Sequence, residues 1–128
     1  MSNLTPETIL TNLGDQPLRD AALLRARLVP DLRQFLDESR GVAEARLLET
    51  QNGLDCARFL SEHMDGLVRC VHDAVVRHLY PAANPSMGER LAVVATGGYG
   101  RGTLAPGSDV DLLFLLPYKQ TAWSESVV

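Results

Sequence analysis

The fold of this chain is decided by residues 95–111, which read Ala-Thr-Gly-Gly-Tyr-Gly-Arg-Gly-Thr-Leu-Ala-Pro-Gly-Ser-Asp-Val-Asp. An apolar run over residues 91–95 leads into this stretch, and a second apolar run follows over residues 109–116. Short apolar runs bounded by glycine and proline are typical of buried strands. The stretch therefore predicts two strands, expected to be antiparallel neighbours, joined by a glycine-rich loop over residues 97–108.

Asp109 and Asp111 are two carboxylates separated by one residue at the start of the second predicted strand. Residues i and i+2 of a strand project from the same face, so both carboxylates should point one way while Val110, Leu112 and Phe114 pack on the other side. Two such anions repel each other and resist burial unless a cation joins them. Hard oxygen ligands suit Mg²⁺, which takes further ligands from water and substrate phosphate. Asp109 and Asp111 are therefore the predicted catalytic and metal-binding residues.

The glycines of the loop supply the second half of the predicted site. They remove side chains where a phosphate would approach the main chain, and successive N–H groups in such a loop form a concavity that binds anions. Arg101 is suited to a charge-assisted phosphate contact. The loop is neither a P-loop, since no Gly-Lys-Ser/Thr follows, nor a dinucleotide fingerprint, since the spacing differs. The predicted nucleotide-binding residues are Gly97, Gly98, Arg101 and Ser108.

Each feature alone also has an ordinary structural explanation. A glycine-rich turn is most often a hairpin, an Asp-x-Asp pair at a strand start is most often a solvated edge or a cap, and a single arginine fits a surface ion pair. The order strand, Gly-Gly, ten residues, Asp-x-Asp, strand is far more specific than any one of its parts. We therefore rest the prediction on the combination.

The residues before the first strand have a helical pattern. Apolar residues recur at three- and four-residue steps from Leu18, and we expect Pro30 to kink or restart this helix and Gly41 to end it as a left-handed cap. A second helix is predicted over residues 42–51, ended by Asn52-Gly53, and a third over residues 54–79.

Two regions follow from this pattern, residues 1–84 and residues 85–128, since prolines at positions 81 and 85 break the third helix. The first region is helical, with a short helix or a frayed segment over residues 1–16, and the second contains both strands. The predicted fold class is thus α+β. Along the third helix, charged residues including Asp65 are expected to stay in water.

Composition excludes several kinds of protein. The 128 residues have a net charge of −4, which disfavours a nucleic-acid surface, and no apolar run approaches the roughly 18 residues of a membrane span. The start of the chain lacks the pattern of a signal peptide, so a cytoplasmic location is expected. Cys56 and Cys70 lie on one predicted helix about 21 Å apart, which excludes a disulfide between them.

The residues around the two strands carry a family resemblance. The strand, the Gly97-Gly98 pair and the Asp-Val-Asp-Leu run from Asp109 resemble the signature of the DNA polymerase β-like nucleotidyltransferase superfamily. Residues 89–117 resemble more narrowly the amino-terminal part of the bacterial protein-PII uridylyltransferase/uridylyl-removing enzymes. That resemblance is close over residues 79–127 and loose over the earlier helices. It implies that residues 85–128 begin a nucleotidyltransferase domain.

The resemblance also implies an activity. Members of this family transfer uridylyl from UTP to a tyrosine of the nitrogen-signal protein PII and release pyrophosphate. By resemblance, Gly97 and Gly98 would meet the triphosphate and Asp109 and Asp111 would hold Mg²⁺, so that catalysis rests on positioning and charge neutralisation. Full-length members also remove uridylyl in a separate hydrolytic domain and respond to glutamine as an effector through carboxy-terminal domains.

Some parts of the family's pattern are absent from these residues. The superfamily uses a third carboxylate on a later strand, and neither that strand nor the hydrolytic and sensing domains are present, so we expect a fragment that is inactive alone. His72-Asp73 lies within a helix without partner histidines and is not assigned as a metal site. Two alternatives stay open: a non-catalytic module that binds nucleotide or a partner, and a sibling adenylyl- or small-molecule nucleotidyltransferase.

Overall fold

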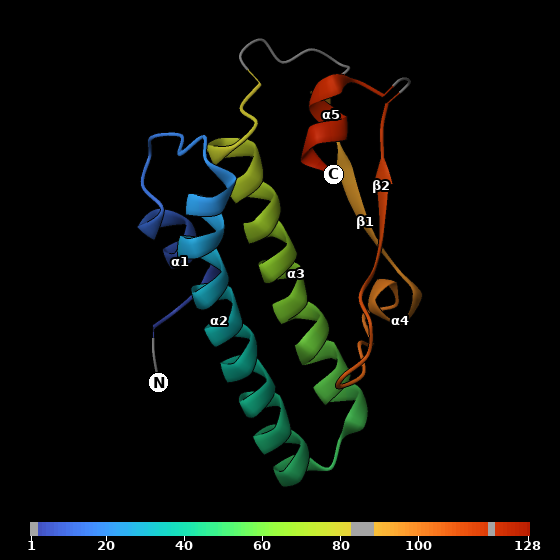
Figure 1. Ribbon diagram of the computed structural model, residues 1–128. Coiled ribbons are helices and arrows are strands. Elements are labelled where there is room, and N and C mark those ends of the chain that lie inside the picture. Colours follow the sequence, from blue (N-terminus) through green and yellow to red (C-terminus); the bar gives the residue numbers. More distant parts are fainter. Residues whose placement is uncertain (1–2, 83–88, 118–119) are drawn as a thin grey trace.

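The computed structural model describes residues 3–82, 89–117 and 120–128, and it has an α+β fold in three layers (Figure 1). Helix α3 lies between the α1–α2 layer on one side and a two-stranded sheet on the other. The fold class predicted from the sequence is confirmed. The elements in chain order are α1 (Pro6–Asn12), α2 (Ala21–Thr50), α3 (Gly53–His78), β1 (Ala92–Thr96), α4 (Gly97–Gly100), β2 (Asp111–Leu115) and α5 (Ala122–Val127).

Helix α1 is a capped helix and not a frayed segment. Thr5 precedes it and accepts a hydrogen bond from the Thr8 backbone N–H at 3.2 Å, while the Thr8 hydroxyl accepts one from the Thr5 N–H at 2.8 Å. Ile9 and Leu13 are buried against α2 and α3. A seven-residue helix is marginal in isolation, so its order depends on this cap and this packing.

Helix α2 corrects the sequence prediction, because it continues without a break from Ala21 to Thr50. The predicted restart at Pro30, the predicted end at Gly41 and the separate helix over residues 42–51 are therefore wrong. The buried positions of α2 continue at helical spacing through both residues and face α3: Leu24, Leu28, Phe35, Ser39 and Ala43. Packing along this face outweighs the lost hydrogen bond at Pro30 and the low helix propensity of Gly41.

Replacement of Gly41 with Ala is expected to stabilise the protein. Gly41 is exposed inside α2, and a Cβ there would meet no atom within 4 Å. Alanine is favoured over glycine by about 1 kcal/mol in a helix interior, so the free energy of unfolding of Gly41→Ala should rise by about that amount in urea titrations. Ala45→Gly, at an exposed position one turn later, is the matched reverse change and should lower it similarly. A destabilised Gly41→Ala would indicate a left-handed cap instead.

The turn between α2 and α3 agrees with the Asn52-Gly53 signal in the sequence. Gln51 is left-handed with φ +53°, and the Asn52 side chain accepts the Asp55 N–H at 3.0 Å. Arg46 of α2 makes two hydrogen bonds to the Asp55 carboxylate at 3.0 and 3.1 Å and lies 4.8 Å over the Phe59 ring. These contacts fix the two helices as a hairpin.

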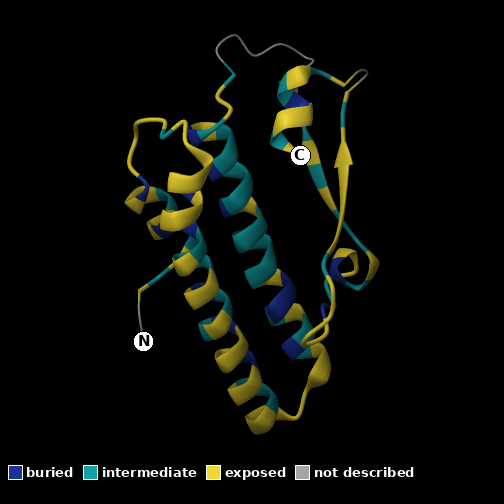
Figure 2. Ribbon diagram, in the orientation of Figure 1, coloured by how far each residue is buried: buried dark blue, intermediate teal, exposed yellow. Residues whose placement is uncertain are grey.

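Helix α3 is the central element, since it is covered on both sides. Figure 2 shows exposed residues along much of α2 and β2, whereas α3 is mostly intermediate or buried. Cys56 and Cys70 are free, as predicted, and both are buried on this helix. Burial, followed by the nearby Asp73 and Glu7 carboxylates, raises the pKa of the Cys70 thiol to about 11, so this thiol stays protonated at neutral pH.

The two strands are antiparallel, as expected, with Ala92 opposite Leu115 and Thr96 opposite Asp111. β2 starts two residues later than predicted, at Asp111, so Asp109 precedes the strand. The strands are also not buried as predicted: Leu113 and Leu115 are each 49% exposed. Helix α3 and the end of the chain line the other face of the sheet, which contains Leu112, so the outer face remains in solvent.

Two apolar clusters hold the layers together. One joins α1, α2 and the second half of α3 around Leu28, Cys70 and Ala74. The other joins Ala43, Cys56 and Leu60 of the helices to the loop residues Tyr99 and Leu104. The predicted boundary between residues 84 and 85 lies outside the described residues. None of the helices that the structure describes is long and apolar enough to cross a membrane.

Candidate active site

The centre of the candidate site is the point where β1 ends and β2 begins. Gly97 follows the last residue of β1, and Asp111 pairs with that residue, Thr96, across the sheet. An ideal Cβ on Gly97 would lie 2.6 Å from the Asp111 Oδ2 atom, and Gly97 has φ +61°. The Asp111 carboxylate therefore sits directly against the Gly97 main chain, in space that no side chain could share.

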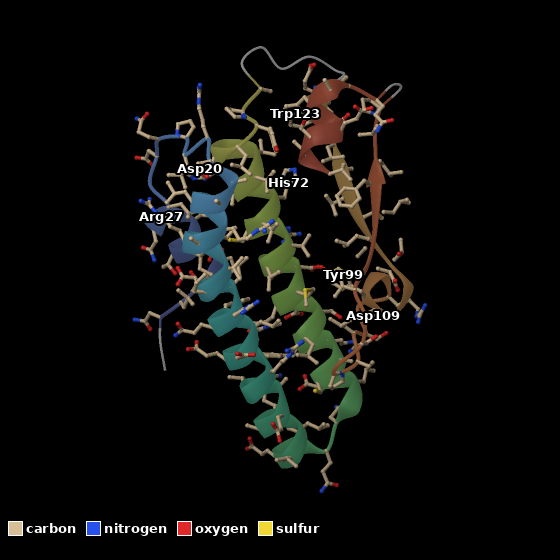
Figure 3. The ribbon with its side chains drawn as sticks, in the orientation of Figure 1. Asp20, Arg27, His72, Tyr99, Asp109 and Trp123 are labelled. Carbon is tan, nitrogen blue, oxygen red and sulfur yellow. The ribbon has the colours of Figure 1, made fainter. Side chains whose placement is uncertain are left out.

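The two carboxylates lie differently with respect to the strand. Asp111 is the first residue of β2 and shares the outer face with Leu113, while Leu112 points inward to α3. Asp109 precedes the strand and is exposed, and Figure 3 shows it at the same end of the hairpin as Tyr99. Within the described residues, no three His, Cys, Asp or Glu side chains form a metal-binding group. Both carboxylates are exposed, and Asp111 lies on the outer face of the sheet.

Arg101 lies beside the second glycine of the pair. Its Nη2 atom is 3.7 Å from the position that a Cβ on Gly98 would occupy, and its side chain is exposed. The Arg101 N–H donates to the Gly97 carbonyl at 3.2 Å, which closes the single turn α4 where the sequence predicted a loop. The structure therefore brings Gly97, Gly98, Arg101 and Asp111 together.

Ser108 lies apart from that group. Its N–H donates to the Ala105 carbonyl at 3.1 Å and its hydroxyl donates to the Asp109 carbonyl at 3.5 Å, so its described contacts are within its own turn. That turn borders a cavity of about 290 Å³ against α2 and α3, which Arg40 and Glu44 also line. None of the described contacts joins Ser108 to the two glycines.

The sequence prediction missed the residues of α3 that hold the glycine loop. The Tyr99 hydroxyl donates to Asp65 Oδ1 at 2.6 Å, and the Leu104 N–H donates to Ser61 Oγ at 2.9 Å. Asp65 was expected to stay in water, and this expectation is corrected. Burial, then the hydrogen bond to Asp65, raises the pKa of Tyr99, so its hydroxyl remains a donor. The signal in the sequence that could have indicated these contacts is Tyr99, an aromatic residue inside a run of glycines.

The three histidines of the chain all lie on α3. His63 stacks on Phe59 with ring centroids 3.9 Å apart, and the His72 Nδ1 atom lies 3.1 Å from Asp73 Oδ1. His78 is buried at the end of α3, and its Nδ1 atom has no hydrogen-bond partner among the described residues. The three histidines therefore lie outside the group formed by Gly97 and Asp111.

Residues 82–123 match the family model described as a nucleotidyltransferase domain. The chain is 51% identical over 105 residues to the bifunctional uridylyltransferase/uridylyl-removing enzyme of Bradyrhizobium sp. (strain BTAi1), covering 82% of this chain and 11% of that protein. Proteins of the same name from Nitrobacter winogradskyi and Rhodopseudomonas palustris are 54% and 44% identical over 75% and 92% of this chain, which cover 10% and 13% of those relatives. No solved structure matches.

The chain thus spans about a tenth of the length of these relatives, and the match covers most of the chain itself. Identity of this degree extends well beyond residues 82–123, so the helical region is matched as well as the sheet. The chain is a homologue of the bifunctional uridylyltransferase/uridylyl-removing enzymes, and its residues 82–123 belong to the nucleotidyltransferase domain family.

Proposed function

We propose that this chain forms the triphosphate- and metal-binding part of a centre that transfers uridylyl from UTP to a tyrosine of the PII signal protein. The observation that carries the proposal is the contact between the Asp111 carboxylate and the side-chain-free Gly97. It puts an acidic oxygen and open main chain next to each other, as a metal-bound triphosphate requires.

The donor set fits Mg²⁺. Asp109 and Asp111 offer hard carboxylate oxygens on an exposed surface, and the missing Cβ of Gly97 lets the Asp111 carboxylate lie against the main chain. A divalent cation held by these two residues would neutralise charge on the triphosphate during attack at the α-phosphorus. Arg101, beside Gly98, would contribute a second positive charge to the same phosphates.

The residues of this chain act by positioning. In the reaction, the acceptor tyrosine hydroxyl loses its proton to solvent and its oxygen forms a bond to the α-phosphorus, while the bond from that phosphorus to the bridging oxygen breaks and pyrophosphate leaves with that electron pair. The main chain at Gly97 and Gly98 would hold the triphosphate so that this leaving group lies in line with the attacking oxygen. We further propose a cytoplasmic location, where UTP and PII are available, and glutamine control exerted by other parts of the full-length protein.

The test uses a chimera in which this chain replaces the corresponding segment of the Bradyrhizobium sp. (strain BTAi1) relative. PII protein is incubated with α-labelled UTP or ATP, with and without Mg²⁺, beside the unaltered relative. We expect label on PII from UTP only, dependent on Mg²⁺ and abolished by EDTA. Labelling from ATP would favour a sibling adenylyltransferase. UTP binding by the chain without any transfer in the chimera would favour a non-catalytic module.

A further inference from the structure

The glycine loop makes two hydrogen bonds to α3, one from Tyr99 and one from Leu104. Tyr99, directly after Gly98, donates its hydroxyl hydrogen to Asp65, and Leu104 donates its N–H to Ser61. Tyr99 and Leu104 are each only 5% exposed; the bond from Leu104 is buried and the bond from Tyr99 is partly buried. Between them lie four residues of chain.

Asp65 and Ser61, which accept the two hydrogen bonds from the loop, lie on the same face of α3. They are separated by four residues, so they lie one above the other on one helix face. Ser61 Oγ donates to the Ala57 carbonyl at 2.9 Å, which leaves its lone pairs free to accept the Leu104 N–H. A hydrogen bond within the loop links these contacts to the predicted phosphate site. The Thr103 N–H donates to the carbonyl of Gly98 at 3.0 Å, so the position of Leu104 also restrains the Gly98 main chain.

Asp65 lies on the opposite side of the sheet from the predicted phosphate site. It lines a cavity of about 240 Å³ with Tyr99, Val93 and Leu112, which belong to the inner face of the hairpin. Asp111 is adjacent to Leu112 in β2 and therefore points to the outer face. A triphosphate bound at Gly97 and Asp111 would not touch Asp65, so any effect of Asp65 on the reaction passes through Tyr99.

We infer that Asp65 and Ser61 are positioning residues, which fix the main chain of Gly97 and Gly98 for the triphosphate through Tyr99 and Leu104. This inference rests on the proposed function. A helix of the amino-terminal region thereby sets the affinity for UTP without contacting it. The Asp65–Tyr99 bond is the stronger of the two, because its acceptor is charged and its distance is short.

The experiment compares four variants in the chimera: Asp65→Ala, Asp65→Asn, Tyr99→Phe and the double variant Asp65→Ala/Tyr99→Phe. We expect the KM for UTP to rise about tenfold in Asp65→Ala and in Tyr99→Phe, with kcat within about threefold and the KM for PII unchanged. Asp65→Asn should recover most of the affinity, because its amide oxygen still accepts the Tyr99 hydroxyl. The KM for UTP of the double variant should not exceed that of Asp65→Ala, since both changes remove the same hydrogen bond.

Glu62→Ala is the matched control, because Glu62 is an exposed carboxylate on the same helix and should leave both KM values unchanged. A purely structural role would instead lower the folded fraction, and so kcat, at constant KM for UTP. That result, or an unchanged KM in Tyr99→Phe, would overturn the inference.

A second readout separates this inference from the proposed function. Amide hydrogen exchange is measured in the 128-residue chain without nucleotide at Arg101, Gly102 and Thr103, whose N–H groups donate within the loop. Tyr99→Phe should speed it about tenfold while exchange along α2 is unchanged. If the unaltered chimera transfers no uridylyl, the proposed function fails while exchange still decides whether α3 positions the loop. Equal exchange in Tyr99→Phe and the parent chain contradicts the positioning itself.

Discussion

We expect Asp111→Asn to lower the proposed uridylyl transfer by at least about a hundredfold while the protein stays folded. Asparagine has the same shape as aspartate, so it still fits against Gly97, but it lacks the negative charge that a divalent cation requires. Asp111 is exposed at the start of β2, so loss of its charge should change the free energy of unfolding by no more than about 0.5 kcal/mol. The rate of PII labelling by the chimera and its urea unfolding curve test both parts.

Asp37→Asn is the matched control for this prediction. Asp37 is an exposed carboxylate of α2, in the layer on the far side of α3 from the sheet, and its loss should leave the labelling rate unchanged (Figure 1). Asp109→Asn should resemble Asp111→Asn, because both are proposed to hold the same cation. Full activity in either of these two variants would contradict the proposed site.

Gly100→Ala is expected to cause the largest loss of stability in the hairpin. A Cβ at this position would lie 2.6 Å from the Ala95 carbonyl oxygen and 2.9 Å from its carbon. These are backbone atoms of β1, so the strand itself would have to move, which costs about 2 kcal/mol or more. Thermal unfolding should show a Tm lower by about 5–10 °C. Since Ala95 lies two residues before Gly97, the shift should also weaken UTP binding.

Gly98→Ala provides the comparison for stability. A Cβ there would lie 3.6 Å from the Thr103 carbonyl oxygen and 3.7 Å from the Arg101 guanidinium, which are ordinary contact distances. Its free energy of unfolding should therefore stay within about 0.5 kcal/mol of the parent protein. If Gly98→Ala and Gly100→Ala unfold at the same temperature, close packing of β1 against α4 is not the reason that Gly100 is required.

Local signals in the sequence predicted the element types but not all of their bounds. The Asn52-Gly53 turn was predicted correctly, because its cap and its left-handed residue are made within a few positions. The break at Gly41 was predicted wrongly, because a glycine's low helix propensity is a local quantity of about 1 kcal/mol. The long contact face between α2 and α3, which includes Ala43, outweighs it and depends on residues beyond the turn.

The sequence by itself determined which residues form the glycine loop and that the Asp-Val-Asp run lies at the beginning of the second strand, although it placed the start of that strand two residues early. Antiparallel pairing of two short strands places their joined ends together, so this part follows from spacing alone. Only the tertiary structure decided that Asp65 of α3 accepts the Tyr99 hydroxyl, 34 residues away. The periodicity of α3 does not distinguish Asp65 from the other charged residues of this helix. Asp65 accepts a hydrogen bond only because the buried side of the glycine loop packs against it in the folded protein.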